Sequence, residues 1–386
     1  MTVVSVDIRQ FRNIKEQHIE FSPGVNLLKG DNAQGKTNAL EALYYFASAK
    51  SFRGVRDREA VMREKTNAYL KLGFSSENDN PQSERFLEVQ LFTQKRKELK
   101  RNGVVIPSAS DFVGSFRAVL FCPEHLQLVK GAPQTRRTFI DTALCQLRPT
   151  YLAALNLYAK LLKQKNALLK NDEMVFGEKR ALLDVLNEQL SVPNAHITAL
   201  RQAYIKELAE KAKEIISDMT KGKEKVEIDY ISDTAREAVN GIEEKKEELR
   251  GKEAYLRRCF ERNQEEKAER ELYAGMTLSG CHRDDLAIRL DGEEAKLYAS
   301  QGQDRSIALA LKLAEGEISR KSCGEYPVFL FDDVLSELDE GRQAYLMGKT
   351  QGKQVIMTAC GEERGKDVHC IEVCGGCFSP SMSKFE

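Results

Sequence analysis

The chain has 386 residues, with 59 Lys and Arg against 59 Asp and Glu, so its formal net charge at neutral pH is +0. This balance argues neither for nor against a nucleic-acid partner, and any DNA-binding surface has to come from local clusters of basic residues. No run of about 18 consecutive apolar residues occurs, and the start of the chain lacks a basic segment followed by an apolar one, so we expect a cytoplasmic protein without a membrane segment.

A phosphate-binding loop follows the first predicted strands. Apolar residues alternate in 3–8, 18–21 and 25–28, and residues 30–37 then have the loop's spacing and lead into a helical pattern at 38–44. The two glycines allow backbone N–H groups to face an anion, and the helix adds the positive end of its dipole. Lys36 is expected to reach the β and γ phosphates of ATP and to act in catalysis, while the Thr37 hydroxyl binds Mg²⁺. The predicted ATP contacts are Gly30, Asp31, Asn32, Ala33, Gln34, Gly35, Lys36 and Thr37.

The middle of the chain is predicted to be a helical insertion into an α/β unit. Residues 69–104 read as a strand meander with a tight turn at Asn102-Gly103, and 116–121 as a buried strand. Helical periodicity then dominates, with amphipathic stretches at 151–169, 182–190 and 197–216, a strand-like interruption at 225–231, and a charged helix at 242–272 that is too short for long coiled-coil arms. The pattern predicts residues 1–122 as the first half of a head, 123–273 as a helical lobe, and 274–386 as the second half.

Two carboxylates end a predicted strand in the second half. Residues 326–331 are largely apolar and run into Asp332 and Asp333, as in a Walker B element. We expect Asp332 to hold Mg²⁺ directly or through water, and Asp333 to position and deprotonate the attacking water.

Two further segments flank this strand. Ser300-Gln301-Gly302-Gln303 precedes a strongly helical pattern at 307–314, and its Ser300, Gly302 and Gln303 are candidate phosphate ligands. Ser336 to Asp339 forms a loop after the strand, in which Asp339 is either a nucleotide-site residue or an ordinary helix N-cap.

The nine cysteines of the chain are expected to be reduced thiols, because they are odd in number and no secretion signal is present. Cys374 and Cys377 have a spacing that zinc accepts, but no matching second pair follows, so Mg²⁺ is the only metal expected.

The order of the four segments resembles the Walker A, signature, Walker B and D-loop series of ABC-type ATPases. In that superfamily the signature of one head completes the site of another, so the resemblance implies an ATP-dependent homodimer in which Ser300 acts on the partner's nucleotide. The fold class implied is an α/β ABC-type ATPase head of mixed β-sheet with helices, split by a helical insertion and without a long coiled coil.

Within this superfamily the chain is similar to the RecF family over nearly its whole length. The segments that carry this similarity are 11–13 (Phe-Arg-Asn), 50–53 (Lys-Ser-Phe-Arg), 121–126, 131–133, Arg136-Arg137, 158–160, 282–285 (His-Arg-Asp-Asp), 300–305 and 332–340. One departure is Cys281, where the family usually has Pro. The other is Met357-Thr358-Ala359-Cys360, which ends the strand that the resemblance implies should carry a γ-phosphate sensor; Thr358 is still able to donate a hydrogen bond to a phosphate or water.

The resemblance implies an ATP-dependent, sequence-independent DNA-binding protein of recombinational repair and replication-fork maintenance, with roles in gap repair and SOS induction. ATP would join two heads, and slow, weak Mg²⁺-dependent hydrolysis would separate them. A RecR-like mediator is the implied partner, with RecO and RecA in the same pathway.

Candidate DNA contacts are clusters of Lys and Arg, since no sequence-reading motif is present. They are Lys95-Arg96-Lys97 with Lys100-Arg101, then Arg53, Arg56 and Arg58, and Arg136-Arg137. A charged run is usually only a solvated face, which is the alternative for each cluster, and Arg53 could instead contact ATP or the partner head.

Two rival functions share parts of this pattern. The nucleotide-binding subunit of an ABC transporter has the same four-segment order, but typically a Ser-Gly-Gly-Gln signature and a shorter helical insertion. A metabolic P-loop kinase would need neither 300–303 nor 336–339.

Overall fold

The computed structural model describes residues 1–77, 84–171, 173–235, 248–360 and 368–380, which form two compact units. The first unit contains Met1–Val129, Glu214–Glu224 and Ser300–Glu386, and the second contains Lys130–Lys213 and Lys225–Ala299. These limits differ from the three segments expected from the sequence. Residues 285–290 form a strand that pairs with residues 226–231 of the second unit, so the chain returns to the head only at Ser300. The head is therefore built from both ends of the chain.

One sheet of the first unit is antiparallel and holds six strands in the order β2-β1-β4-β5-β6-β7. Its members are β1 (Thr2–Phe11), β2 (Ile14–Glu20), β4 (Asn67–Ser75), β5 (Arg85–Phe92), β6 (Glu98–Arg101) and β7 (Val104–Ile106). Leu70 lies opposite Val89 in the register of β4 and β5. The predicted tight turn is confirmed between β6 and β7, where Asn102 and Gly103 have φ of 50° and 79°.

A second sheet carries the phosphate-binding loop. Its order is β15-β14-β3-β13-β12-β8, and every neighbouring pair is parallel except β14 with β15. The strands are β3 (Val25–Lys29), β8 (Ala118–Phe121), β12 (Val328–Phe331), β13 (Val355–Ala359), β14 (Val368–Cys374) and β15 (Cys377–Pro380). All residues of β8, β12 and β13 are buried, as expected for the centre of a parallel sheet. The carboxyl ends of β3, β13 and β12 consequently meet at one edge.

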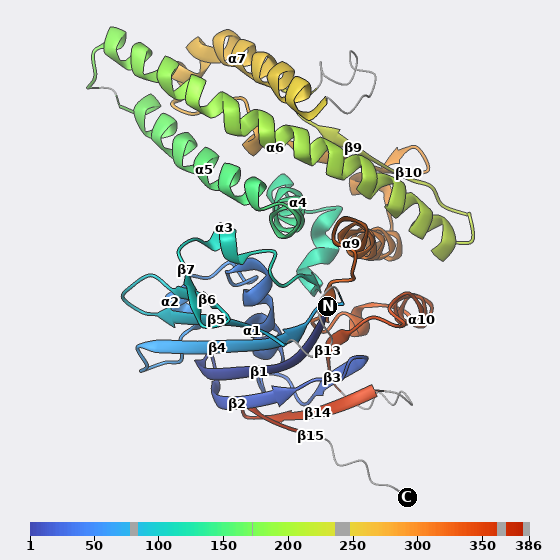
Figure 1. The fold of residues 1–386 in the computed structure, drawn as a ribbon. Helices are drawn as coiled ribbons and strands as arrows, with labels where there is room; N and C mark the ends of the chain where they lie inside the picture. Colours follow the sequence, from blue (N-terminus) through green and yellow to red (C-terminus); the bar gives the residue numbers. More distant parts are fainter. Residues whose placement is uncertain (78–83, 172, 236–247, 361–367, 381–386) are drawn as a thin grey trace, which may run out of the picture. The chain divides into compact units, whose positions relative to one another are not determined.

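Helices of the first unit connect and cover these sheets (Figure 1). They are α1 (Lys36–Ser48), α2 (Asp57–Ala60), α3 (Ala109–Phe112), η1 (Pro123–Leu128), α9 (Gln301–Cys323), η3 (Leu335–Glu337) and α10 (Glu340–Lys349). Helix α1 packs against β1, β4 and β5 of one sheet and β8 and β13 of the other, so both sheets fix its position. Gly316 of α9 lies against the Phe329 ring, where a Cβ atom would come within 2.5 Å of the ring.

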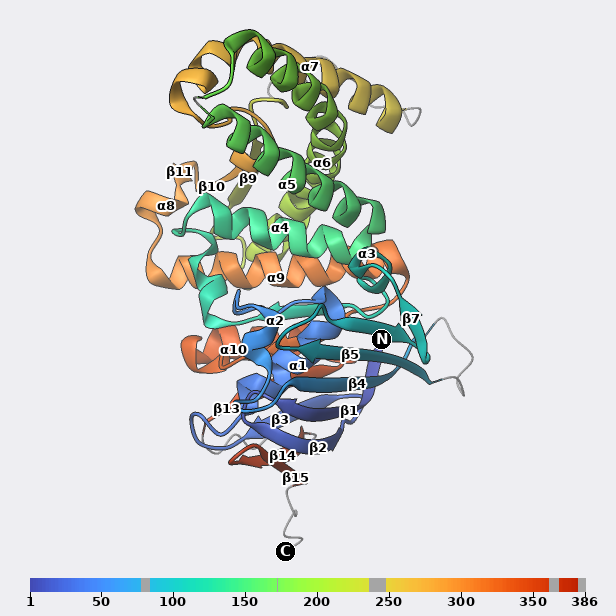
Figure 2. The same cartoon turned by 90° about the vertical axis from the view of Figure 1, so that its left-hand side faces the viewer.

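The second unit consists of helices around a small antiparallel sheet, as the two views of Figures 1 and 2 show. Its helices are α4 (Pro133–Leu147), α5 (Pro149–Leu169), α6 (Phe176–Met219), α7 (Glu248–Ala274), η2 (Cys281–Arg283) and α8 (Ala295–Tyr298), and the last residues of α6 belong to the first unit. Strands β9 (Val226–Ile231), β10 (Asp285–Leu290) and β11 (Glu293–Glu294) have the order β11-β10-β9. The predicted strand at 225–231 is confirmed by β9, and residues 242–247 of the predicted charged helix lie outside the described part.

The two amphipathic stretches predicted at 182–190 and 197–216 are one helix, α6, which continues through Pro193. Proline removes one helical N–H, which normally favours a break. The residues on both sides of Pro193 are buried, and their packing stabilises the helix across the proline. They are Ser191, Asn194 and Ala195. Tertiary packing here outweighs local propensity.

Candidate nucleotide-binding site

The loop between β3 and α1 has the geometry predicted from its sequence. Ala33 and Gly35 lie in the left-handed region with φ of 64° and 117°, and α1 starts at Lys36. Gly30 allows no side chain, since a Cβ atom there would be 2.2 Å from the Val373 carbonyl oxygen of β14. The loop is thus shaped both by its own backbone turns and by the adjacent strand.

The Lys36 side chain lies along this loop and is only 7% exposed. Its Nζ donates to the carbonyl oxygen of Gly30, to that of Asp31 at 3.2 Å, and to the Cys360 Sγ at 2.9 Å. The Cys360 thiol in turn lies 2.9 Å from Asn32 Oδ1. These partners of the ammonium group are uncharged, so its positive charge remains available to an anion.

Two hydroxyl groups converge on Asp332 at the end of β12. Thr37 Oγ1 and Thr358 Oγ1 donate to the same oxygen, Asp332 Oδ1, at 2.8 and 3.1 Å. Burial raises the pKa of the Asp332 carboxyl, and these hydrogen bonds oppose that rise. A hard cation bound at this oxygen would stabilise the ionised form.

Asp333 follows in the left-handed conformation, with φ of 53°, and its N–H donates to Thr358 Oγ1 at 2.8 Å. Positive φ is costly for a residue with a Cβ atom and here turns the chain sharply after the strand. Thr358 therefore uses its hydroxyl to hold both carboxylate residues, and the γ-phosphate sensor expected on this strand stays a prediction.

A pocket of about 390 Å³ opens over the loop. Its lining residues are Asn13, Asn32, Ala33, Gln34, Gly35, Lys36, Thr37, Asn38, Arg53, Asp333, Thr358 and Cys360. The predicted residues Gly30, Asp31 and Asp332 lie beside the pocket and do not line it, and Ser300, Gly302, Gln303 and Asp339 are also not among the lining residues. Arg53, considered above as either a DNA or an ATP contact, does line it.

A buried carboxylate that pairs with the pocket residue Arg53 was missed by sequence reasoning. Glu41 of α1 is fully buried and accepts hydrogen bonds from Arg12 Nε at 3.0 Å, Arg12 Nη2 at 2.6 Å and Ser51 Oγ at 2.5 Å. Arg53 approaches the same carboxylate at 3.6 Å and also donates to Asn38 Oδ1. Glu41 thus joins segments 11–13 and 50–53, which carried the family resemblance without an assigned role. In the sequence, only these two short motifs indicated that the segments around Arg12 and Ser51 have a shared role.

The signature and D-loop segments lie at the starts of neighbouring helices of the head. Ser300 caps α9, accepting from Gln303 N at 3.3 Å, while the Gln303 side chain accepts from Ser300 N at 2.9 Å. Asp339 caps α10 and accepts from Arg342 N at 2.9 Å, and this contact lowers the pKa of its carboxyl. Arg342 Nε also donates to Ser306 Oγ of α9 at 2.8 Å. The N-cap interpretation of Asp339 is confirmed. The Arg342 contact places the start of α10 beside the first turns of α9.

The cysteines of the tail flank the turn between β14 and β15, where Cys374 lies opposite Cys377. Within the described ranges no group of three or more His, Cys, Asp and Glu side chains is arranged to hold a metal ion. The Thr37 hydroxyl and Asp332 carboxylate nevertheless supply the oxygen ligands that Mg²⁺ prefers when phosphates and waters complete its shell.

Arg136, a candidate DNA contact, is instead part of the interior of the second unit. It is 4% exposed and donates to both carboxylate oxygens of Asp285, at 2.6 and 2.8 Å, and to Gly131 O at 2.9 Å. Arg137 donates to the Asp284 carbonyl at 2.6 Å. The prediction of a DNA contact is therefore wrong for Arg136, because its guanidinium already satisfies a carboxylate.

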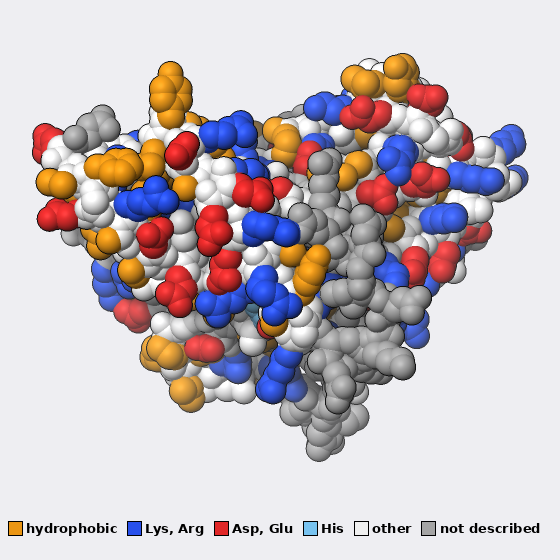
Figure 3. Space-filling view, turned by 90° about the horizontal axis from the view of Figure 1, so that it is seen from above, with side chains coloured by type: hydrophobic (Ala, Val, Ile, Leu, Met, Phe, Trp, Pro, Cys, Tyr) orange, Lys and Arg blue, Asp and Glu red, His pale blue; other side chains and the backbone are white. Residues whose placement is uncertain are grey.

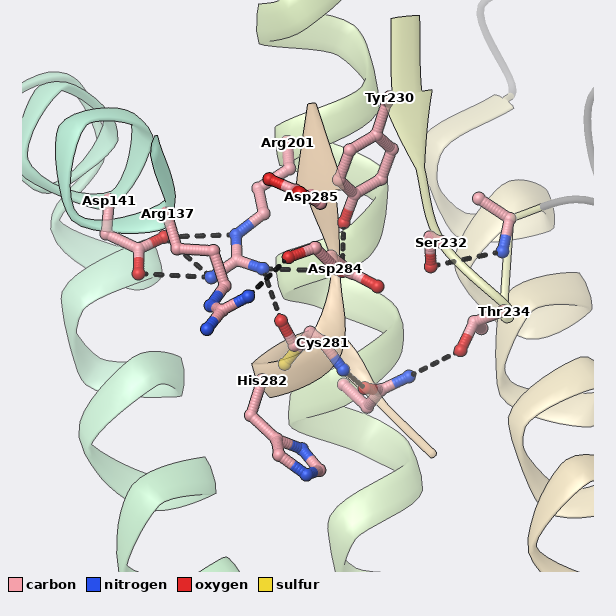
Figure 4. A network of polar contacts seen from close by, with 12 residues as sticks. Arg137, Asp141, Arg201, Tyr230, Ser232, Thr234, Cys281, His282, Asp284 and Asp285 are labelled. Carbon is pink, nitrogen blue, oxygen red and sulfur yellow. Dashed lines mark hydrogen bonds and ion pairs between the residues drawn. The ribbon is translucent and has the colours of Figure 1, made fainter. Parts of the chain in front are cut away.

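Arg137 and Asp284 belong to a larger polar network, shown in Figure 4. Arg201, 2% exposed, donates to both oxygens of Asp141 at 2.8 and 3.0 Å, to Cys281 O at 2.6 Å and to Asp284 Oδ2 at 3.3 Å. Tyr230 donates to the same Asp284 oxygen. Burial raises the pKa of Asp284 to about 6. The His-Arg-Asp-Asp segment is thus a structural element of this unit.

The departure at Cys281 has a local explanation. The Cys281 N–H donates to Asn194 Oδ1 at 2.8 Å, a hydrogen bond that proline at this position would lack. Cys281 thereby links η2 to α6 close to Pro193.

Other basic candidates are partly paired within the chain. Lys95 lies 2.6 Å from Glu98, and Lys97 lies 2.9 Å from Asp57. On the face seen in Figure 3, Lys and Arg side chains alternate with Asp and Glu, so the coloured part of that face has no large area of one sign. None of the helices described here is long and apolar enough to cross a lipid bilayer.

The fold and site define an SMC-type ATPase head. Residues 2–373 match the model of the RecF/RecN/SMC N terminal domain family. The head of Smc bound to the C-winged helix domain of ScpA has a similar fold, with a TM-score of 0.51 and 14% identity over 98% of this chain and 96% of that one.

More specific similarity identifies the family. The DNA replication and repair protein RecF of Halalkalibacterium halodurans is 41% identical over 354 residues, which cover 91% of this chain and 90% of the relative. A solved structure described as the recombination mediator protein RecF-ATP in the RecFOR pathway superposes with a TM-score of 0.87 and 31% identity, covering 98% of this chain and 97% of that one. The chain belongs to the RecF family, and the transporter alternative is not favoured.

Proposed function

We propose that this chain is a RecF-type ATP-dependent DNA-binding protein of recombinational repair and replication-fork maintenance, acting in gap repair and SOS induction. The observation that carries the proposal is the convergence of Lys36, Thr37 and Asp332 beside one pocket in a chain of this family. The relatives named for DNA repair and the solved RecF-ATP structure support it.

The loop fits the triphosphate of ATP on the features of its own residues. Lys36 carries an uncompensated ammonium group, the backbone turns at Ala33 and Gly35 leave room for an anion, and Arg53 adds a second cation at the pocket. In this proposal the contacts are residues 30–37, with Lys36 at the β and γ phosphates. Thr37 and Asp332 hold Mg²⁺, which neutralises phosphate charge when it is bound.

Asp333 is the proposed base for the attacking water. It lines the pocket, and the Thr358 hydroxyl fixes its backbone through the N–H of the same residue. Fixing the backbone keeps the Asp333 side chain at the pocket, where its carboxylate would accept a proton from a bound water. We propose weak ATPase activity, used as a switch.

The signature and D-loop residues are proposed to act in a second copy of the chain. Ser300, Gly302, Gln303 and Asp339 do not line the pocket of their own head. The exposed Ser300 cap at the start of α9 has N–H groups and a helix dipole suited to a γ-phosphate. ATP bound between two heads would therefore stabilise the dimer, and hydrolysis would remove that link.

DNA binding without sequence preference is proposed to accompany dimerisation, in a cytoplasmic protein that works with a RecR-like mediator and with RecO and RecA. Affinity for DNA is expected to fall steeply with salt, because Lys and Arg contacts to phosphates release counterions.

The test is light scattering of the wild type, Lys36→Ala and Ser300→Arg proteins with and without Mg-ATP. ATP is expected to convert only the wild type from monomer to dimer, with stronger duplex binding at low salt. A mixture of the two variants should recover dimer, since one of its two composite sites has both Lys36 and Ser300 intact. If the mixture behaves like the separate variants, the shared site is refuted. If ATP binds without any dimer or DNA response, the repair switch is abandoned.

A further inference from the structure

A second pocket of the first unit, of about 240 Å³, is lined by three arginines. Arg85 begins β5, Arg101 ends β6, and Arg117 directly precedes β8. Ser115, Cys323 and Glu325 also line it. None of these residues lines the pocket over the phosphate-binding loop, so the two sites are separate.

The one carboxylate among the lining residues is already satisfied. Glu325 accepts from Arg117 Nη2 at 2.8 Å, Ser76 Oγ at 2.8 Å and Glu77 N at 3.0 Å, and it pairs with the Met1 ammonium at 3.0 Å. Although burial acts in the opposite direction, these contacts lower the pKa of the Glu325 carboxyl. Glu325 therefore stays ionised and offsets the guanidinium charge of Arg117, whereas the Arg101 guanidinium lies against neutral oxygens.

Arg101 has only neutral partners, and Arg117 is incompletely hydrogen-bonded apart from its ion pair with Glu325. Arg101 donates to the Asp111 carbonyl and to Ser115 Oγ at 2.5 Å, both neutral oxygens. Arg117 is 9% exposed, its Nη1 contact to Gly114 O is long at 3.4 Å, and its Nε has no hydrogen-bond partner within the described chain. A buried, incompletely bonded guanidinium is costly, and an anion nearby lowers that cost.

We propose that this pocket is a second oxyanion site, which takes a phosphate group either as a free ion or as part of a nucleic-acid backbone. The planar guanidinium groups of arginine suit a phosphate because they donate paired, charge-assisted hydrogen bonds. Arg101 and the Ser115 hydroxyl supply hydrogen-bond donors, and the incompletely bonded Arg117 guanidinium supplies a further donor at Nε. The site does not depend on ATP binding.

The experiment uses the Lys36→Ala protein, in which the phosphate-binding loop is disabled. Inorganic phosphate is titrated at constant ionic strength, and binding is followed by calorimetry and by the alkylation rate of Cys323, which lines the pocket. Arg101→Met is the test variant, because Arg101 is exposed and its loss leaves the Arg117–Glu325 pair intact. Arg63→Met, an exposed arginine outside the pocket, is the matched control.

We expect saturable phosphate binding in Lys36→Ala, slower Cys323 alkylation, and a loss of affinity of about tenfold or more on adding Arg101→Met. Arg63→Met should change neither readout. If phosphate has no effect but Arg101→Met weakens duplex binding and Arg63→Met does not, the site takes the phosphate of a nucleic acid. Absence of both responses, or equal effects of the two variants, would overturn the proposal. A Lys36→Ala protein that binds phosphate here but does not dimerise separates this result from the proposed ATP switch.

Discussion

Replacing Arg136 with Met tests whether this residue is structural or touches DNA. Methionine keeps much of the side-chain volume but removes two charge-assisted hydrogen bonds to Asp285, at 2.6 and 2.8 Å. Breaking a fully buried ion pair by removing one partner costs about 3–5 kcal/mol. The Asp285 side chain is 26% exposed, so water partly solvates the carboxylate left behind. We therefore expect a loss of about 2–4 kcal/mol in the free energy of unfolding.

The assay is denaturant unfolding followed by circular dichroism, with duplex binding measured under conditions in which the variant is folded. Arg148→Met, at the exposed C-cap of α4, is the control and is expected to unfold within about 0.5 kcal/mol of the wild type. Adding Asp285→Asn to Arg136→Met should recover part of the lost stability, because the unpaired charge is then absent. Wild-type stability combined with a large loss of DNA affinity in Arg136→Met would refute the structural role.

Three more changes probe other parts of the molecule. Thr358→Val removes the hydroxyl that contacts Asp332 Oδ1 and is expected to lower ATP hydrolysis by about tenfold or more while ATP-dependent dimerisation persists; unchanged turnover would contradict the positioning role. The pKa of Asp284 is about 6 in the folded protein, above its value in the unfolded chain. The folded state therefore binds the proton more tightly, and its stability should fall as pH rises from about 4 to 6. Asp284→Asn should flatten this trend in thermal melts recorded across that range. Gly316→Ala forces a Cβ atom within 2.5 Å of the Phe329 ring and should cost about 1–3 kcal/mol in denaturant unfolding, whereas an unchanged midpoint would mean that the ring moves freely.

The phosphate-binding loop and the Walker B strand were predictable because their signals are local. A strand, a glycine-containing turn and a helix follow one another within 25–48, and the parallel sheet then brings Asp332 to Thr37. The N-cap at Asp339 was predictable for the same reason. Each of these three features is set by a few consecutive residues that all favour the same local backbone conformation.

Longer-range features were not accessible in this way. The burial of Glu41 depends on Arg12 and Ser51 approaching from separate segments, and a single Glu in a helix gives no sign of this. The position of residues 274–299 depends on β10 pairing with β9, a match between strands more than 50 residues apart. The charge of Arg136 was visible in the sequence, but its partner Asp285 was not.

The order of strands in the second sheet has a consequence for the chain during its synthesis. Strand β3 lies between β13 and β14, which begin at Val355 and Val368, so both of its neighbours are made more than 300 residues later. At roughly 5–20 residues per second, β3 spends about 15–65 s without either neighbour during translation. A nascent chain that stops before residue 355 has the complete loop motif but cannot build the sheet that supports it. Products truncated before residue 355 should therefore be aggregation-prone, and the sheet that supports the nucleotide site forms only after β13 and β14 have been made.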